Sequence, residues 1–401
     1  MLAQGRPLDG ALANAFHGVD RPDDRALARS LASGVLRWLV DLDALIDSAT
    51  PKPLPPDARA RMALRIGLAG RLLLNTPPHA VVATTLALTE GGPRRLTHAV
   101  LSRLLREDAR LPDRPTLPEP YATRWRATWG NAAVAAAADA FGHEPPVDLT
   151  LRDPDATEQW AAALEGVSFA PGHVRLTERA SIPDLPGFAD GAWWVQDLAA
   201  SLPARLLAPP PGTATLDLCA APGGKTLQLA AMGAAVTALD SSEPRLDRLR
   251  ENLARTGLRA AIVAVDALVW APPAPFGHIL LDAPCSASGV FRRHPDVLHL
   301  KGERDLRPLL AVQAALIDRA VDWLAPGGTL VFSTCSLERA EGEDQLAAAL
   351  ARHPHLRLDP VASDELPAGI PVTDGVVRVL PGMLAARGGV DGFFIARLRK
   401  R

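Results

Sequence analysis

LDLCAAPGGKTLQLA, residues 216–230, joins an apolar run, a double glycine and a helical pattern without interruption. Gly223 and Gly224 let the backbone approach a ligand closely, and the helix that follows offers free N–H groups at its start. A phosphate-binding P-loop needs glycine where Cys219 stands, and a G-x-G-x-x-G dinucleotide fingerprint is also absent. The stretch therefore predicts a strand, a turn and a helix at a ligand site, and it excludes the two commonest kinds of nucleotide site.

Further apolar runs repeat this pattern downstream, and each closes on a polar residue: AAVTALD, AAIVAVD, HILLDAP and GTLVFSTC. Buried parallel strands that alternate with helices predict an α/β fold with an open, doubly wound, Rossmann-like sheet. Ligands bind at the carboxyl ends of the strands in such sheets. We therefore expect the closing residues to share one edge: Asp217, Asp240, Asp266, Asp282 and Cys335. Beyond residue 370, GVVRVLP and DGFFIARLR predict antiparallel strands.

The pattern of residues 24–110 predicts helices instead. Apolar side chains at spacings of three and four form one helical stripe: Leu27, Leu31, Val35, Leu39, Leu42 and Ile46. The proline-rich ARLPDRPTLPEP then predicts a linker, and short strands alternate with helices over residues 121–200. We expect three parts: an all-α helical bundle over residues 1–120, a small α/β connector over 121–200 and the doubly wound sheet over 201–401.

The composition is typical of a folded protein in a reducing, cytoplasmic compartment. The chain has 401 residues, 48% of them hydrophobic, and its three cysteines form no C-x-x-C pair. Neither a disulfide framework nor a zinc site is therefore expected. No signal peptide is recognisable, and no apolar stretch approaches the roughly 20 residues that a bilayer needs. We expect a monomer with no metal and no membrane contact.

Charge is nearly balanced overall but not along the chain. The net charge is −2, whereas residues 1–130 carry 18 Lys plus Arg against 13 Asp plus Glu. An excess of cations permits contact with nucleic acid, but a solvated helical surface explains it equally well. On charge alone, the solvated surface is the better interpretation.

Two acids at neighbouring strand ends narrow the choice of ligand. Asp240 can accept hydrogen bonds from a ribose diol, and Asp266 stands where an adenine amine would lie. Adenosine bound without a phosphate cradle indicates S-adenosyl-L-methionine. Any one acid alone is better explained as a helix cap or a solvated loop end. Together with Asp217, however, these acids make three at successive strand ends beside a double glycine, and this arrangement favours a cofactor site.

Two thiols lie at the ends of the fourth and fifth strands, Cys285 in LLDAPCSASG and Cys335 in VFSTCSLE. A single buried cysteine is usually inert packing, but two at one edge beside a methyl donor indicate nucleophilic chemistry. Carbon 5 of a pyrimidine becomes nucleophilic when a thiolate adds at carbon 6, and a second base must then remove its proton. Asp282 can hold the edge of the base. A helix predicted over residues 336–345 would favour the thiolate of Cys335 through its dipole.

In these motifs the chain resembles the RsmB (Sun) type of rRNA cytosine-5 methyltransferase. DLCAAPGGKT, DAPCSASGV, RRHPD and STCSLE occur in order, and SGVLRWLVDLDALID, RIGLAGRLLLNTPPHAVV and RLTHAVLSRLL are similar to that family's NusB-like RNA-binding bundle. The resemblance implies that Cys335 is the nucleophile, that Cys285 assists proton removal and release, and that Lys225 and Asp282 face the base. It also implies residues around S-adenosyl-L-methionine: Cys219, Ala220, Ala221, Pro222, Gly223, Gly224, Lys225, Asp240, Asp266 and Asp282. Gly342 departs from the family, which commonly has asparagine there.

Cations cluster soon after Cys285 and are expected to hold RNA phosphates: Arg292, Arg293, His294, Lys301 and Arg304. The alternative is a solvated loop. Trp193 and Trp194 are candidates for stacking on bases, although core packing explains at least one of them better.

We expect a methyltransferase that acts on a cytosine in small-subunit (16S) rRNA. Two other functions stay open at this point. An RNA-binding assembly or antitermination factor with an inactive enzyme domain would leave both thiols and the strand-end acids unexplained. A DNA cytosine methyltransferase would use Cys285, which follows Pro284, as the attacking thiol.

Overall fold

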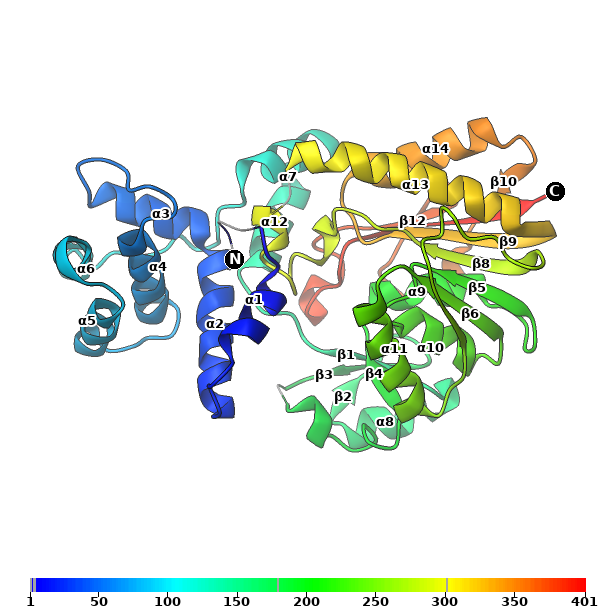
Figure 1. The fold of residues 1–401 in the computed structure, drawn as a ribbon, viewed down its shortest axis with the longest axis horizontal. Helices are drawn as coiled ribbons and strands as arrows, with labels where there is room; N and C mark the ends of the chain where they lie inside the picture. The colour runs from blue at the N-terminus through cyan, green and yellow to red at the C-terminus, as the bar shows by residue number, and fades with distance from the viewer. Residues whose placement is uncertain (1, 3–4, 179, 301) are drawn as a thin grey trace. The chain divides into compact units, whose positions relative to one another are not determined.

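The computed structural model describes residue 2 and residues 5–178, 180–300 and 302–401. Within these ranges the chain forms two compact units (Figure 1). The first comprises Met1–Glu144 and Phe291–Gly302, and the second comprises Pro145–Val290 and Glu303–Arg401. The three parts expected from the sequence, with boundaries near 120 and 200, stay a prediction. Among the helices of the described residues, none has the length and apolar character needed to cross a bilayer.

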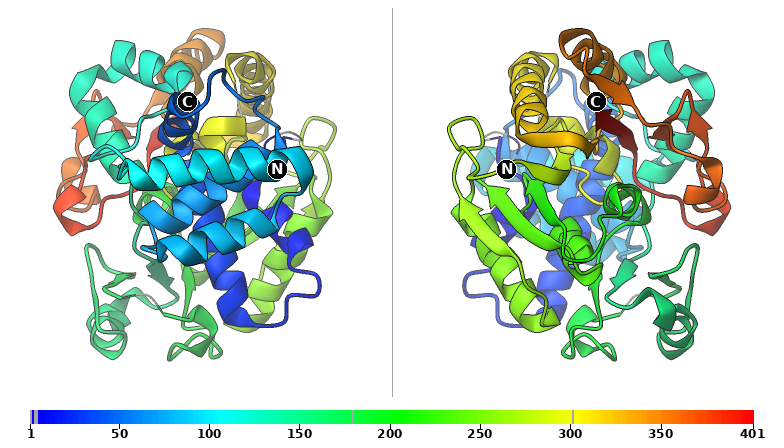
Figure 2. Two further views of the ribbon diagram at one scale, coloured as in Figure 1. Left: turned by 90° about the vertical axis from the view of Figure 1, so that its left-hand side faces the viewer. Right: turned by 90° about the vertical axis from the view of Figure 1, so that its right-hand side faces the viewer.

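Helices make up the first unit. Their bounds are α1 (Leu8–Ala15), α2 (Pro22–Arg37), α3 (Leu39–Ser48), α4 (Arg59–Leu72), α5 (Pro78–Ala87), α6 (Gly91–Arg106), α7 (Glu119–Phe141) and α12 (Val297–Leu300). The stripe expected as one helix is divided between α2 and α3 at Trp38, and its residues Leu42 and Ile46 are fully buried. Helices α4, α5 and α6 pack against one another around this core (Figure 2). One apolar face on each helix accounts for the bundle.

A short segment from far along the chain completes the first unit. The ring of Phe291 packs against that of Phe141, with 5.8 Å between the centroids. The buried side chain of Arg37 donates hydrogen bonds to the carbonyl oxygens of Phe141 at 2.9 Å and Arg292 at 2.6 Å. Residues 291–302 are therefore built into the helical unit, although they directly follow a loop of the second unit.

The second unit begins with a small antiparallel sheet in the order β2-β3-β1-β4. Its elements are β1 (Asp148–Leu151), α8 (Thr157–Ala163), β2 (Gly166–Val167), β3 (His173–Leu176) and β4 (Trp193–Val195). The buried carboxylate of Asp148 accepts hydrogen bonds from Arg175 at 2.6 Å and 2.8 Å and from the N–H of Leu198 at 3.0 Å. Asp148 therefore ties the small sheet to helix α9 (Leu198–Leu207), which packs on the large sheet.

A large mixed sheet forms the rest of the second unit, in the order β11-β12-β13-β9-β8-β5-β6-β7, with β10 paired to β13. Its strands are β5 (Ala214–Leu218), β6 (Ala235–Asp240), β7 (Ala261–Ala264), β8 (Phe276–Asp282), β9 (Leu324–Thr334), β10 (Leu356–Leu358), β11 (Val372–Thr373), β12 (Val376–Val379) and β13 (Phe393–Lys400). Strands β5 to β9 are parallel, and β10 to β13 pair antiparallel. The predicted doubly wound sheet and the C-terminal antiparallel strands are confirmed.

Helices cover both faces of the large sheet (Figure 1). Helices α9, α10 (Gly224–Ala231) and α11 (Glu243–Thr256) lie on one face, and α13 (Glu303–Trp323) and α14 (Glu343–Arg352) lie on the other. Single turns of 3-10 helix complete the units: η2 (Pro154–Ala156), η3 (Ile182–Asp184), η4 (Ser288–Val290), η5 (Arg339–Glu341), η6 (Ser363–Glu365) and η7 (Ala385–Arg387).

Strand order determines where a ligand can bind. From β5 the chain moves outward to β6 and β7, and it then returns to β8 on the other side of β5. The carboxyl ends of β5 and β8 therefore flank the switch point, where crossovers diverge and leave a crevice.

One local expectation near this edge is wrong. No helix begins directly after Cys335, because η5 intervenes and α14 begins at Glu343. A helix dipole acts mainly within one turn of the helix end, so it does not act on the sulfur of Cys335.

Candidate active site

A cavity of about 190 Å³ opens at the carboxyl ends of β5 and β8. Its wall consists of the glycine turn and neighbouring residues: Val195, Gln196, Ala200, Asp217, Cys219, Ala220, Ala221, Pro222, Gly223, Gly224, Lys225 and Asp282. The whole predicted motif over residues 219–225 lies in this wall, together with Asp282. The sheet topology therefore gathers these residues at one place.

The glycine turn keeps its backbone close to the cavity. Gly223 has φ 109°, and a Cβ at this position would overlap Leu249 of α11. Asp240, at the end of β6, accepts hydrogen bonds from the N–H groups of Ala221 at 3.1 Å and Ser242 at 2.9 Å. Asp240 therefore anchors the turn from behind the wall, and each of its oxygens retains a lone pair for a further donor.

Asp266 is placed differently from Asp240. It follows β7 by two residues, is exposed, and accepts a hydrogen bond from the N–H of Leu268 at 2.9 Å. It is not part of the cavity wall. The structure thus brings Asp240 to the glycine turn and leaves Asp266 at the outer part of the sheet edge.

Asp217 is a buried acid in the cavity wall. Thr226 donates a hydrogen bond to its Oδ2 at 2.5 Å, whereas its Oδ1 has no hydrogen-bond partner within the described part of the chain. Burial raises the pKa of Asp217 to about 7, against the opposing effects of the Thr226 hydrogen bond and the Lys225 charge. A buried carboxyl with one oxygen unused suits a polar or cationic group of a ligand.

Lys225 and Asp282 form the charged part of the wall. The Lys225 ammonium lies 2.7 Å from Oδ2 of Asp282, and Ser333 donates a hydrogen bond to Oδ1 at 2.9 Å. The two side chains are 11% and 27% exposed, so a ligand can reach them. Burial opposes protonation of Lys225, but Asp282 and Cys335 outweigh it and raise its pKa. Lys225 therefore stays positive beside both the acid and the thiol.

The two predicted thiols meet. The sulfurs of Cys285 and Cys335 lie 3.5 Å apart, although the residues follow different strands. The hydrogen bond with Cys335, together with burial, raises the pKa of Cys285 well above its ordinary value. Cys335 is the less buried of the two and lies within the electrostatic reach of Lys225.

Cys219 does not join this pair. It occupies the left-handed region with φ 61°, directly after β5, and packs against the core of the sheet. Burial and the nearby Asp240 raise the pKa of its thiol, which therefore stays neutral. Its place in the turn is a matter of backbone shape and not of nucleophilic chemistry.

A buried carboxylate beside the thiols was not predicted. Glu341 is 0% exposed and accepts hydrogen bonds from the N–H of Ser286 at 2.8 Å and from the hydroxyls of Ser286 and Ser336 at 2.5 Å and 2.6 Å. The side chain of Gln313 donates a fourth at 3.0 Å. An acid among the charged residues of LERAEGED is typical of an exposed helix start, so the sequence carries no signal for it. Gln196, in the cavity wall, was missed as well.

The cations expected to hold RNA lie partly in the first unit. Arg292 is 3% exposed, Arg293 is partly exposed, and His294 lies on the surface, 3.6 Å from Asp9. Lys301 lies outside the described residues, and so does the side chain of Arg304. Contact of these residues with RNA stays a prediction, for which the structure makes Arg293 and His294 accessible.

The prediction that Trp193 or Trp194 stacks on bases is wrong. Trp193 and Trp194 are both buried, and the indole N–H of Trp194 donates to the side chain of Gln196 at 2.7 Å. Neither ring offers a face on which a base can stack. Trp194 shares a core with Ala220 and Ala221 of the cavity wall, whereas Trp193 belongs to the core of the small sheet.

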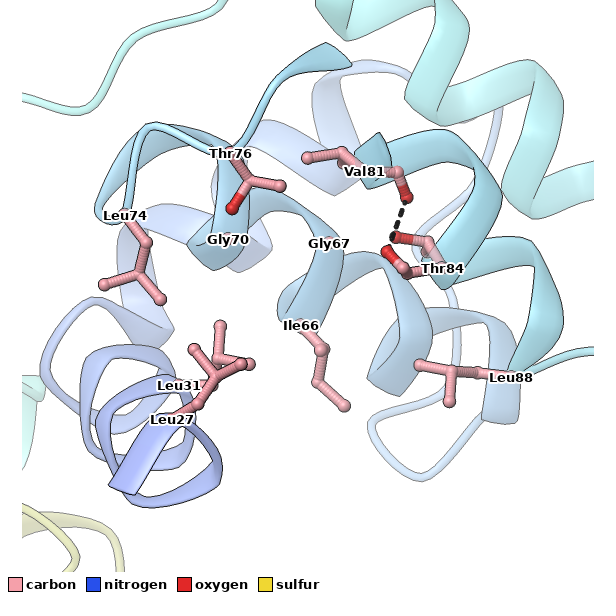
Figure 3. Close-up of a pocket in the computed structure, with 11 residues that line it drawn as sticks. Leu27, Leu31, Ile66, Gly67, Gly70, Leu74, Thr76, Val81, Thr84 and Leu88 are labelled. Carbon is pink, nitrogen blue, oxygen red and sulfur yellow. Dashed lines mark hydrogen bonds between the residues drawn. The ribbon is translucent and has the colours of Figure 1, made fainter. Parts of the chain in front are cut away.

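The first unit carries an apolar cavity of about 310 Å³ (Figure 3). Leu27 and Leu31 of α2 lie across it from Thr84 and Leu88, and Ile66 of α4 lies between them. None of the side chains that line this cavity titrates. It offers an apolar surface but no acid, base or nucleophile.

Comparison with known proteins matches the N-terminal and C-terminal parts of the chain to two protein families. Residues 204–399 match the family described as 16S rRNA methyltransferase RsmB/F, and residues 1–105 match the NusB family. Ribosomal RNA small subunit methyltransferase B of Xylella fastidiosa (strain Temecula1) is 40% identical over 421 residues, which cover 100% of this chain and 95% of that protein. The protein of the same name from Cronobacter sakazakii is 34% identical over 430 residues, which cover 100% and 96%.

Solved structures share the fold. A methyltransferase homolog protein from Pyrococcus horikoshii is 28% identical, with a TM-score of 0.59 over 75% of this chain and 98% of its own. NSun6 from Pyrococcus horikoshii, solved with SFG, is 20% identical, with a TM-score of 0.61 over 71% and 98%. At that identity, the second likeness concerns the fold alone.

Proposed function

The chain belongs to the ribosomal RNA small subunit methyltransferase B (RsmB) family and is an S-adenosyl-L-methionine-dependent rRNA methyltransferase, and we propose that it methylates carbon 5 of a cytosine through a covalent bond to Cys335. The observation that carries this proposal is the 3.5 Å separation of the Cys335 and Cys285 sulfurs beside the Lys225–Asp282 pair. Methyl transfer to oxygen or nitrogen needs no such pair of thiols.

The cavity fits the cofactor. S-adenosyl-L-methionine supplies the transferred methyl group when it is bound. The N–H groups of Gly223 and Gly224 at the start of α10 would hold it, because those of Ala220 and Ala221 already donate to Leu239 and Asp240 and Pro222 has none. Asp240, behind the turn, offers acceptor oxygens for hydroxyl groups. Asp217 offers its buried Oδ1, which has no hydrogen-bond partner among the residues that the structure describes. Of the residues that the resemblance implies, exposed Asp266 has the weakest support.

Cys335 begins the reaction on the cytosine ring. Its thiolate adds to carbon 6, so that an S–C bond forms and electron density moves to carbon 5. The Lys225 ammonium and the Cys285 thiol lie beside Cys335 before the attack. Carbon 5 then forms its new bond to the methyl carbon, whose bond to the sulfonium sulfur would break and leave S-adenosylhomocysteine. Cys285 is more deeply buried than Cys335, which argues against Cys285 as the attacking thiol.

Asp282 and Lys225 act on the polar edge of the base. Oδ1 and Oδ2 of Asp282 already accept hydrogen bonds from Ser333 and Lys225, which fixes the carboxylate in one orientation. The carboxylate retains lone pairs that can accept from the exocyclic amine of cytosine, and Lys225 can donate to an oxygen of the ring edge. Both charges are in place before the substrate arrives, so no reorganisation is needed during the attack.

Cys285 completes the reaction. Its pKa is high chiefly because Cys335 shares a hydrogen bond with it. Once Cys335 is bonded to carbon 6, the effect of that hydrogen bond disappears and only the effect of burial remains, so that Cys285 can pass its proton to water and act as a base. It then takes the proton from carbon 5, the electrons of that C–H bond restore the ring double bond, and the S–C6 bond breaks to return Cys335 as a thiolate.

The first unit, which includes the segment that follows the thiols, is the proposed RNA-binding part of the chain. Residues 291–302 belong to the helical unit and begin six residues after Cys285. The similarity of residues 1–105 to the NusB family supports an RNA-binding role for the bundle. Among the described residues of this segment, Arg293 is partly exposed and His294 lies on the surface, and both are proposed phosphate contacts.

The identity of the methylated nucleoside tests the proposal. Small-subunit rRNA from cells that lack the gene is incubated with the purified enzyme and S-adenosyl-L-methionine carrying an isotope-labelled methyl group, digested to nucleosides and analysed by mass spectrometry. We expect the label in 5-methylcytidine. Label found in another nucleoside would overturn the cytosine-5 assignment and leave the family membership intact.

A further inference from the structure

Glu341 joins two loops that have no covalent link near the site. Ser286 directly follows Cys285, and Ser336 directly follows Cys335. One carboxylate oxygen of Glu341 accepts from both serine hydroxyls, at 2.5 Å and 2.6 Å, and the other accepts from the N–H of Ser286 at 2.8 Å. The carboxylate therefore holds the residue after each thiol within one hydrogen-bond length of itself.

The burial of the Glu341 carboxylate has to be compensated by hydrogen bonds. Glu341 is fully buried, and burying a carboxylate costs several kilocalories per mole unless hydrogen bonds compensate. Gln313, on the long helix α13, provides one of these bonds at 3.0 Å and also donates to the carbonyl of Pro284 at 2.9 Å. Hydrogen bonds of the same network therefore fix the Cys285 loop on both sides of its thiol, at Pro284 and at Ser286.

We propose that Glu341 is a positioning residue that holds the sulfur of Cys285 against that of Cys335, an inference that rests on the proposed two-thiol reaction. Glu341 lies within electrostatic reach of Cys285, and its hydrogen bonds go to the neighbours of both thiols. It acts through the serines that follow the two cysteines, and it sets the distance between the loops on which those cysteines lie. The reacting distance between the sulfurs therefore depends on a residue outside the cavity wall.

The two loops do not depend equally on Glu341. Cys335 directly follows β9, which is paired on both sides up to Ser333 and Thr334, and its carbonyl accepts a hydrogen bond from Gly289 at 3.0 Å. Cys285 lies three residues beyond the end of β8 and two residues before Ala287, whose φ of 59° is in the left-handed region. Loss of the carboxylate should therefore displace Cys285 more than Cys335.

This asymmetry identifies the step that depends on Glu341. Attack on carbon 6 needs Cys335, the cation Lys225 and the base-edge acid Asp282, none of which bonds to Glu341. Removal of the carbon 5 proton needs Cys285 in place. Weakening Glu341 should slow proton removal and release, so that enzyme covalently attached to RNA accumulates. A loss of general stability would instead lower attachment and release together.

Disulfide formation between the two thiols measures their proximity without RNA or cofactor. In the full chain treated with diamide, Cys285 and Cys335 lose two protons and two electrons, an S–S bond forms, and diamide becomes the corresponding hydrazine. The linked peptides are quantified by mass spectrometry over time. We expect Glu341→Gln, which replaces an acceptor oxygen by a donor, to slow this reaction by about tenfold or more, since displacements of about 1 Å have effects of that order. Asp344→Asn, which removes an exposed carboxylate three residues away, is the matched control and should react like the wild type.

RNA attachment supplies the second measurement. We expect Glu341→Gln to retain its affinity for S-adenosylhomocysteine and to accumulate covalent RNA complex. If Glu341→Gln does not fold, Ser286→Ala and Ser336→Ala replace it, each removing one hydroxyl from the carboxylate. A folded variant with an unchanged rate of disulfide formation and unchanged release would overturn the positioning role. Slower disulfide formation together with no covalent complex in the wild type would instead retain the positioning role and refute the proposed reaction.

Discussion

Replacing Asp217 with asparagine should change how the stability of the protein depends on pH. Burial raises the pKa of Asp217 to about 7 in the folded chain, from an ordinary value of 3.8. Between these two values the folded state binds more protons than the unfolded state, so the free energy of unfolding falls as the pH rises through this window. A difference of about three pH units corresponds to at most roughly 4 kcal/mol. Asp217→Asn removes the titrating group, so the variant does not lose this stability as the pH rises.

The assay is urea unfolding of the full chain without cofactor, followed by tryptophan fluorescence, for the wild type and the variant. We expect the two to be similar near pH 4, the variant to gain relative stability as the pH rises, and the gain to level off above about pH 7. Asp190→Asn, at an exposed position of the same unit, is the control and should differ from the wild type by a constant amount. A gain that is independent of pH, or that grows toward acid, would refute the assignment of a protonated, buried Asp217.

Three further predictions concern the cavity wall and its surroundings. Asp240→Ala removes the acceptor for the N–H groups of Ala221 and Ser242, so we expect the free energy of unfolding to fall by about 1–2 kcal/mol. We also expect a fall in the affinity for S-adenosylhomocysteine, measured by calorimetry. An equal fall in RNA affinity would contradict the assignment of Asp240 to the cofactor. Gly342→Asn would place a Cβ against Arg378 and Phe394, which should cost roughly 1–3 kcal/mol in urea unfolding, whereas a neutral or stabilising effect would show that Arg378 moves aside freely. Lys225→Gln removes the cation beside Cys335, and we expect iodoacetamide to alkylate Cys335 more slowly near pH 7; an unchanged rate would mean that Lys225 does not favour the thiolate.

The sequence predicted the edge of the sheet well, because strand ends in a doubly wound sheet are fixed by few rules. Apolar runs that close on polar residues put Asp217 and Asp282 at neighbouring carboxyl ends, and the structure places both in the cavity wall. Cys335 follows directly after β9, as expected. Parallel pairing and the switch of direction at β5 then bring these residues together without any need to know the side-chain contacts.

Features that depend on long-range packing could not be predicted. Glu341 lies in a charged stretch, and nothing local indicates that two serines and a glutamine from elsewhere will bury it. Residues 291–302 follow the Cys285 loop closely in sequence, yet the fit of Phe291 against Phe141 places them in the helical unit. After Cys335 the backbone forms only the short turn η5, and Gly342, with φ −124° and ψ −92°, is non-helical before α14 begins at Glu343.

The departure at Gly342 also acquires a physical reason. Arg378 donates to both carboxylate oxygens of Glu343, at 3.0 Å and 2.6 Å, and to the carbonyl of Ser336 at 2.6 Å. Its guanidinium occupies the space that a side chain at Gly342 would need. The glycine therefore makes room for an arginine that supports the loop carrying Cys335.

The most direct test of the proposed reaction is to locate the covalent bond between protein and RNA. Enzyme, rRNA substrate and S-adenosyl-L-methionine are mixed, denatured and digested, and the peptide that carries a cytosine nucleotide is sequenced by mass spectrometry. We expect the nucleotide on Cys335, in larger amounts for Cys285→Ala than for the wild type, and none for Cys335→Ala, which should also form no methylated product. Full turnover by Cys335→Ala, or a nucleotide attached to Cys285, would contradict the proposed mechanism.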